Sequence, residues 1–266
     1  MLAPLLFAVV ASAVNVRAEG DRTVERARYA FVLDAHRRFD EVYPLSMFQA
    51  RARREILEER VLAERFGMSV TPAVLAGEFD RIGRETKARD EWETIKRALG
   101  GDRRRIEDIY CRPLLVERAL HARFDFDQEI HAGPHQQARR ARTELLAGRK
   151  PEGARSLLLS RIAEAPVSTE EMLSDAKARS RPPAKIEPPA APRNDRPIPL
   201  DAEVRGVLER ELKFPADVTT ILEERSAFVV YRLVAVTPSS WRVDAIEVAK
   251  VDFDSWFARE AAKIDR

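Results

Sequence analysis

Histidines and acidic residues are the side chains in this sequence that could do chemistry, and few of them are spaced for it. His131 and His135 lie four residues apart, a spacing that lets two imidazoles on one helix bind a metal ion. Gly133 and Pro134 stand between them and argue against a shared helical face. No carboxylate or cysteine completes a ligand set, so we expect no metal site and no cofactor.

A pair of carboxylates, Asp125 and Asp127, flanks Phe126 and would share one face of an extended segment. Such a pair could act as acid and base, but a polar loop between two domains is the simpler interpretation. The sequence contains no serine–histidine–aspartate signature, phosphate-binding glycine loop or Cys-x-x-Cys motif. The single cysteine, Cys111, lies beside Tyr110 in an apolar stretch, so we expect a buried and inert thiol.

Methionine and aromatic side chains in the first half of the chain are more informative. Most of them must form a core, but some are expected to line an apolar groove, because flexible methionines and flat rings suit varied polypeptide partners. The candidates for polypeptide binding are Met47, Phe48, Met68 and Trp92.

The elements that would position these residues are mainly helices. Residues 19–128 carry apolar side chains at helical spacing and are predicted to form a helical domain. Gly67 is expected to end one helix, Thr71 with Pro72 to begin the next, and Asp102 to cap another. Pro113 falls within an apolar-periodic stretch and predicts a kink or break near Cys111.

A second domain is predicted over residues 129–240, with a Pro-rich stretch at 180–199 that is too poor in apolar residues to fold and is interpreted as a flexible loop. Other elements are assigned by pattern, with helices at 136–147, 152–165 and 201–212 and strands at 219–223 and 227–236.

Residues 241–266 complete the chain with a strand, Trp241 to Val251, and a helix, Asp252 to Ile264. Phe253, Trp256 and Phe257 give that helix an apolar face, which we expect to pack on residues 46–124. The predicted fold class is therefore α+β and predominantly helical, with a small antiparallel sheet.

Residues 1–18 are typical of a cleavable secretory signal, because an uncharged apolar run is followed by small residues. Cleavage is expected after Ala18 or Ala13, and the alternatives are an uncleaved N-terminal anchor or a buried first helix. The protein is thus predicted to be periplasmic or secreted. Charged residues make up 34% of the chain, yet the net charge is only +2 with both signs interspersed, so a nucleic-acid partner is not expected.

The stretch Ile56 to Ile82 resembles the N-terminal chaperone domain of SurA- and PrsA-type folding factors. The resemblance is carried by Phe66-Gly67-Met68-Ser69-Val70-Thr71, a helix end and glycine turn before the next helix, and by Asp102 to Phe124, which is similar to the long helix that closes that domain. In that family a parvulin-type prolyl isomerase domain follows.

Residues 130–236 contain traces that are similar to such a parvulin domain. Ile130-His131 resembles its opening strand with a histidine, Ala138 to Gly148 its Ala-rich helix, and Val204 to Val236 its closing half. The glycine-rich middle segment is absent, and the region 226–230 lacks the second histidine of the family. The resemblance leaves His131 as the one candidate catalytic residue.

Together, the resemblance implies an exported folding factor with a degenerate parvulin-like domain, which holds unfolded or partner polypeptides without catalysis. Two alternatives stay open: an active peptidyl-prolyl isomerase with a divergent pocket, and a structural subunit of an envelope complex.

Overall fold

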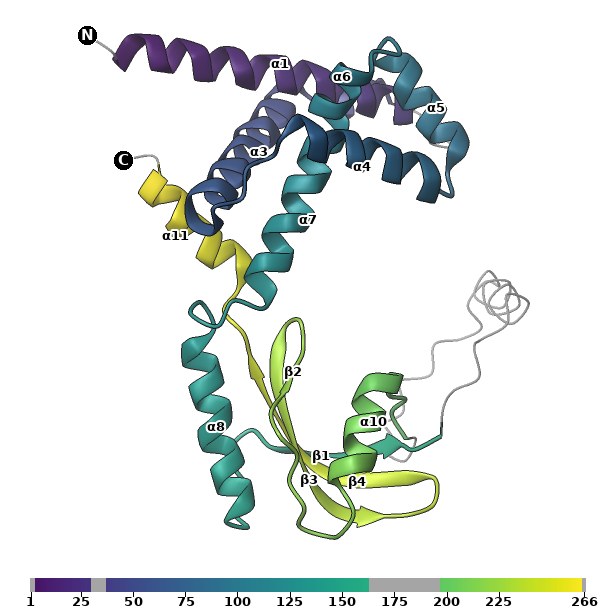
Figure 1. The fold of residues 1–266 in the computed structure, drawn as a ribbon, viewed down its shortest axis with the longest axis vertical. Helices are drawn as coiled ribbons and strands as arrows, with labels where there is room; N and C mark the ends of the chain where they lie inside the picture. The colour runs from purple at the N-terminus through teal and green to yellow at the C-terminus, as the bar shows by residue number, and fades with distance from the viewer. Residues whose placement is uncertain (1–2, 30–36, 163–196, 265–266) are drawn as a thin grey trace. The chain divides into compact units, whose positions relative to one another are not determined.

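The computed structural model describes residues 3–29, 37–162 and 197–264, which form two compact units (Figure 1). Unit 1 comprises residues 1–127 and 252–266, and unit 2 comprises residues 128–251. The C-terminal strand therefore belongs to unit 2 and the C-terminal helix to unit 1. Most of the Pro-rich stretch predicted as a loop lies outside the described residues.

Unit 1 is helical throughout its described part, as the apolar periodicity predicts. Its elements are α1 (Ala3–Tyr29), α2 (Phe39–Val42), α3 (Leu45–Phe66), α4 (Pro72–Glu85), α5 (Arg89–Ala98), α6 (Arg103–Ile106), the π-helical segment η1 (Glu107–Cys111), α7 (Arg112–Asp125) and α11 (Phe253–Ile264).

The predicted helix boundaries at Gly67, Thr71 and Asp102 are confirmed. Gly67 ends α3 with φ +66°, a left-handed conformation that glycine adopts without strain. The Thr71 side chain accepts a hydrogen bond from the backbone N of Val74, and the Asp102 carboxylate accepts from the first backbone N–H groups of α6.

The irregularity expected around Pro113 is present as the π-helical turn η1, which ends at Cys111 just before the proline. A proline has no N–H to donate, so the helical ladder must change its pattern there. Cys111 is fully buried as predicted, and its burial raises the pKa of the thiol to about 12. The thiol is therefore protonated at neutral pH, which makes it a poor nucleophile.

Helix α1 is an integral part of the core of unit 1. Val14 and Ala18 are buried in one cluster with Phe48 of α3. Gly20 lies so close to Ile109 that a Cβ atom at this position would stand 2.5 Å from the Ile109 side chain. Cleavage after Ala18 would remove two members of the cluster, and the predicted signal stays a prediction. None of the described helices is long and apolar enough to cross a membrane.

The C-terminal helix α11 packs on the helical unit, as its apolar face predicts. The ring of Trp256 lies 4.9 Å from that of Phe124 and 6.0 Å from that of Phe66, measured between ring centroids. An ion pair of 2.8 Å between Arg54 and Asp254 joins α3 to the first turn of α11. Through this packing, unit 1 is built from segments near both ends of the chain.

Unit 2 is a four-stranded antiparallel sheet with a helix on each face (Figure 1). The strands β1 (Arg155–Ser160), β2 (Leu222–Glu223), β3 (Ala227–Val236) and β4 (Ser240–Ala249) lie in the order β1-β4-β3-β2. Helix α8 (Ala132–Leu146) buries its apolar side against Val230 and Val248, whereas α10 (Ala202–Glu211) packs on the residues of the other face, such as Leu233 and Val243. The predicted α+β class with a small antiparallel sheet is confirmed.

Two local predictions for unit 2 are wrong. The helix expected at Glu152 to Ala165 is instead the strand β1, because Gly153 turns the chain at φ +81° and the following residues pair with β4. Tertiary pairing overrides the helical preference of three consecutive leucines. The strand expected at Ile130-His131 is a turn that leads into α8.

Candidate functional site

The largest cavity described in unit 2 lies beside the start of α8. It has a volume of about 490 Å³, which is within the range of ligand-binding pockets. A neighbouring cavity of about 330 Å³ shares His135 and Arg139 with it. We call these two adjoining cavities the α8 trough. Its walls come from α8 on one side and from β2, β3 and the residues just before β2 on the other.

His131 and His135 line the same cavity without sharing a helical face, because His131 precedes α8 and His135 lies in its first turn. Pro134 occupies the first turn, where a backbone N–H has no partner within the helix, so it does not interrupt α8. The backbone N of His135 donates to the carbonyl of His131 at 2.9 Å, and both residues line the same cavity.

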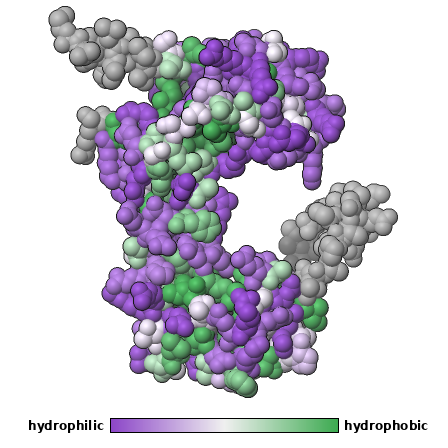
Figure 2. All heavy atoms as spheres, viewed as in Figure 1, coloured by the Kyte–Doolittle hydropathy of each residue, from purple (hydrophilic) through white to green (hydrophobic). Residues whose placement is uncertain are grey.

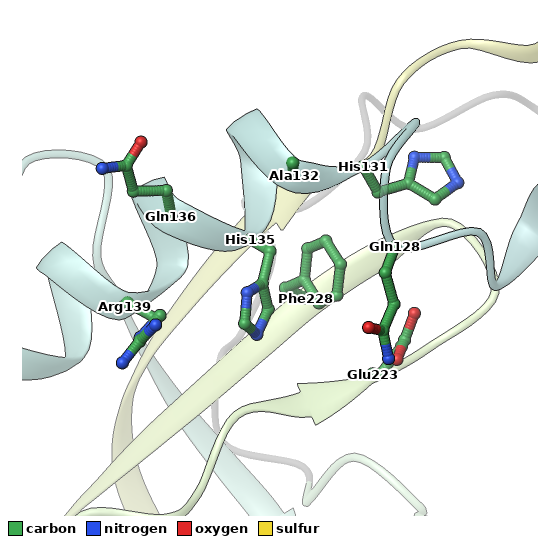
Figure 3. Close-up of a pocket in the computed structure, with 8 residues that line it drawn as sticks. All are labelled: Gln128, His131, Ala132, His135, Gln136, Arg139, Glu223 and Phe228. Atoms are coloured by element: carbon green, nitrogen blue, oxygen red, sulfur yellow. The ribbon is translucent and has the colours of Figure 1, made fainter.

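The two imidazoles have different environments. His131 is 1% exposed, and its Nδ1 accepts a hydrogen bond of 3.3 Å from the backbone N of Val251. This bond requires the proton on Nε2 and links the start of α8 to Val251, two residues after the end of β4. In Figure 3 the two rings point in different directions, with His135 directed toward Phe228. His131 is thus placed as a buried positioning residue.

The floor of the α8 trough is Phe228, which is buried in β3. The imidazole of His135 meets the Phe228 ring edge-on, at 5.1 Å between centroids. The ammonium of Lys250 lies 5.0 Å from the centre of the same ring and pairs with Glu223 at 2.9 Å. The carboxylate of Glu223 is therefore neutralised by a buried lysine.

The far part of the α8 trough is basic. Arg139 and Arg142 project from successive turns of α8, and Nε of Arg142 donates to the carbonyl of Thr219 at 2.7 Å. Ile221 adds an apolar wall here. The trough therefore combines aromatic and aliphatic surface with side chains that donate hydrogen bonds.

A separate cavity of about 450 Å³ lies in unit 1, and its walls are mostly apolar. Ala13, Val16, Ile56 and Ile109 line it, and Val16 is 65% exposed. The cationic side chains at its rim are already paired, because Arg112 contacts Glu59 at 2.7 Å and Asp108 at 2.8 Å.

Buried carboxyl groups near that cavity are strongly perturbed. Burial raises the pKa of Asp21 in α1 to about 6 and that of Glu55 in α3 to about 8, although Arg17 and Arg51 oppose the shift for both groups. One oxygen of each carboxyl group is buried without a hydrogen-bond partner among the described residues. The packing of α1 on α3 thus encloses protonatable groups.

The four residues predicted to bind polypeptides have separate places in unit 1. Phe48 is fully buried beneath α1, and Trp92 is 6% exposed, with its ring between those of Phe79 and Tyr110. Their role is core packing, which corrects the expectation that they face a groove.

Met47 and Met68 are half-buried. Met47 packs beside the Phe48 cluster, and the sulfur of Met68 accepts from Nε of Arg123 at 3.1 Å. Neither methionine lines one of the cavities described above.

Metal binding finds no support in the described part of the chain, which contains no group of three or more histidine, cysteine, aspartate or glutamate residues arranged to hold an ion. Asp125 is buried at the end of α7, whereas Asp127 follows that helix, so the acid pair does not share an extended face.

Several residues of the α8 trough are not predicted from the sequence. Arg139, Glu223 and Phe228 are far apart in the chain and come together only through the packing of α8 on the sheet. A usable signal is the i, i+4 pair His135 and Arg139, which places polar groups on one face of α8.

Comparisons with known proteins find no matching family model, curated protein or solved structure. The resemblance to SurA- and PrsA-type folding factors therefore stays a prediction that rests on the residues quoted for it.

Proposed function

We propose that this protein binds non-native polypeptides and acts as a folding factor of the cell envelope or the exterior. The single observation that carries this proposal is the α8 trough, a ligand-sized cavity that combines an aromatic floor with polar side chains able to bond a peptide. A polypeptide needs both kinds of contact, because its side chains are partly apolar and its backbone is polar throughout.

Where residues 1–18 are retained, unit 1 adds an apolar cavity at Val16, Ile56 and Ile109. Its rim charges are paired within the protein, so this surface favours uncharged apolar segments. Figure 2 shows further apolar patches within a largely hydrophilic surface on the visible face of the molecule. Separate apolar patches suit ligands that vary in sequence.

A second candidate function is prolyl isomerisation. It is favoured by the presence of His131, His135 and Phe228 around one cavity, since isomerisation of a prolyl bond needs a shaped and partly apolar pocket. The burial of His131 and its bond to Val251 favour a positioning role over contact with substrate.

The experiment measures two activities of the full-length protein. In the first, an unfolded model protein is diluted into buffer with and without the chain, and light scattering reports its aggregation. In the second, cis–trans relaxation of a proline tetrapeptide is followed. We expect suppressed aggregation at near-stoichiometric ratios and no acceleration of the prolyl relaxation.

Aggregation that is unaffected by the protein would contradict the binding proposal. Clear acceleration of prolyl relaxation that is lost in His135→Ala would replace it with the isomerase function. The matched control is Arg140→Ala, at an exposed position of α8 that lines neither cavity of the trough.

A further inference from the structure

Three polar side chains of the α8 trough have unused hydrogen-bonding capacity. Gln128, His135 and Arg139 make no hydrogen bond or ion pair through their side chains to any of the described residues, although all three line the larger cavity. In Figure 3, Arg139 lies at one end of the cavity, His135 near its middle and Gln128 toward the end occupied by Glu223. These groups are free to bond a ligand.

The charge of the cavity is unbalanced. Its one carboxylate, Glu223, is paired with Lys250, whereas the guanidinium of Arg139 has no anion beside it. A guanidinium keeps its charge at all physiological pH values and forms two parallel bonds to a carboxylate. His135 donates an N–H in either protonation state. The missing partner of this surface is therefore a negative group.

The floor of the cavity adds a second requirement. Phe228 and Ala132 present apolar surface beside His135, so a ligand that fills the cavity also buries apolar atoms there. The larger cavity offers one guanidinium and one imidazole, which match a single negative charge, and Arg142 in the smaller cavity already donates to the carbonyl of Thr219. Phosphate groups carry nearly two negative charges and are usually bound by clusters of arginines. A carboxylate next to an apolar side chain satisfies both requirements.

We propose that the α8 trough binds an extended peptide segment, with a carboxylate of the peptide held by Arg139 and His135 and a neighbouring apolar side chain placed on Phe228. This inference rests on the proposed polypeptide binding and names the class of segment that is bound. The carboxylate comes from an aspartate or glutamate side chain or from the C-terminus of the peptide.

The test measures the dissociation constants of fluorescent decapeptides for the full-length protein by anisotropy. One peptide carries a central Leu-Glu pair and an amidated C-terminus, a second has Leu-Gln instead, and a third has Leu-Gln with a free C-terminal carboxylate after a leucine. We expect at least one of the two acidic peptides to bind about 10-fold more tightly than the neutral one. The peptide that does so identifies the source of the carboxylate.

Matched variants assign the effect to the trough. Arg139→Gln is expected to abolish the preference for the acidic peptide, whereas Arg140→Gln, on the neighbouring and exposed position of α8, keeps it. Equal affinity of all three peptides for the unchanged protein would overturn the inference while leaving polypeptide binding intact, as would an equal loss in both variants. Absence of binding by every peptide would overturn the inference, and unsuppressed aggregation in addition would overturn the proposed function.

Discussion

Charged side chains do different work in the two units of this molecule. In unit 1 the buried carboxylate of Glu78 is matched by two arginines of the protein. Glu78 of α4 is 4% exposed and accepts hydrogen bonds from both Arg81 and Arg118, with the Arg118 bonds at 2.7 and 2.9 Å. In the α8 trough of unit 2, Arg139 lines a cavity whose one carboxylate, Glu223, is already paired with Lys250.

A charged residue is thus structural or functional according to its partners rather than its residue type. A paired arginine has its donors satisfied and contributes to packing between helices. An arginine beside an aromatic floor, whose donors make no bond within the protein, can bond a ligand. Removal of paired charges in unit 1 should therefore destabilise the fold, whereas the charge of Arg139 in the trough should be dispensable for folding.

The largest effect is expected from the core residue that sequence reasoning placed in a groove. Phe48→Ala should destabilise unit 1 by about 4 kcal/mol, because it leaves a cavity beneath α1. Met47→Ala, at the half-buried neighbouring position, should cost about 1 kcal/mol. Hydrogen exchange measured separately for segments of α3 and β3 reports the stability of unit 1 and of unit 2. Equal losses of stability of unit 1 in the Phe48→Ala and Met47→Ala variants would contradict the assignment of Phe48 to the core.

The charge cluster of Glu78 provides the next test. Glu78→Gln should destabilise unit 1 by about 2 kcal/mol, since two arginines lose their charged acceptor. The hydrogen bonds from Arg81, with those from Arg118, lower the pKa of Glu78 to about 2. Its contribution is therefore present above the unfolded pKa near 4.5 and is lost as pH falls toward 2. Denaturant unfolding at pH 6 and pH 3 gives the free energy of unfolding of the Glu78→Gln variant and of the unchanged protein. A difference between the two proteins that is equally large at both pH values would refute this role of Glu78.

A pH effect in the opposite direction is expected from Asp21 and Glu55. Their pKa values are raised in the folded state, so the folded protein keeps protons that the unfolded chain releases near pH 4. The stability of unit 1 should then fall as pH rises from about 4 to 8. Glu55→Gln should flatten this slope. A slope that is unchanged in the variant would show that Glu55 is ionised in the folded protein.

The smallest effect on stability is expected in the trough itself. Arg139→Gln should change the free energy of unfolding of unit 2 by less than about 0.5 kcal/mol, because the side chain is exposed and makes no ion pair with the described residues. A loss of 2 kcal/mol or more, seen by hydrogen exchange in β3, would mean that Arg139 is structural and would remove the contrast between the units.

Much of the fold follows from the sequence where local signals agree. Gly67 marks a helix end because it adopts the left-handed conformation, and Thr71 and Asp102 mark helix starts because their side chains accept hydrogen bonds from backbone N–H groups. The apolar face of Phe253 and Trp256 requires an apolar surface to pack on. These features depend on neighbours along the chain or on a single apolar stripe.

The α8 trough could not be predicted in this way. It depends on α8 lying across β3, which brings Phe228 to His135. The strand β1 was missed for a similar reason, since its leucines are strand residues only because β4 offers a place to pair. Residue type alone cannot distinguish an aromatic side chain in the core from one that lines a groove, which is why the sequence predicts a binding role for Phe48 and Trp92.

Polypeptide binding by unit 2 in the α8 trough can be tested by site-specific photo-crosslinking. A photoreactive amino acid is placed at Gln136, on the wall of the trough, or at Glu203 on α10, which covers the opposite face of the sheet. An unfolded, labelled polypeptide is then added to each full-length protein and irradiated. We expect strong crosslinking from position 136, reduced by Arg139→Gln, and weak crosslinking from position 203. Equal crosslinking from both positions would show that polypeptides do not bind in the trough.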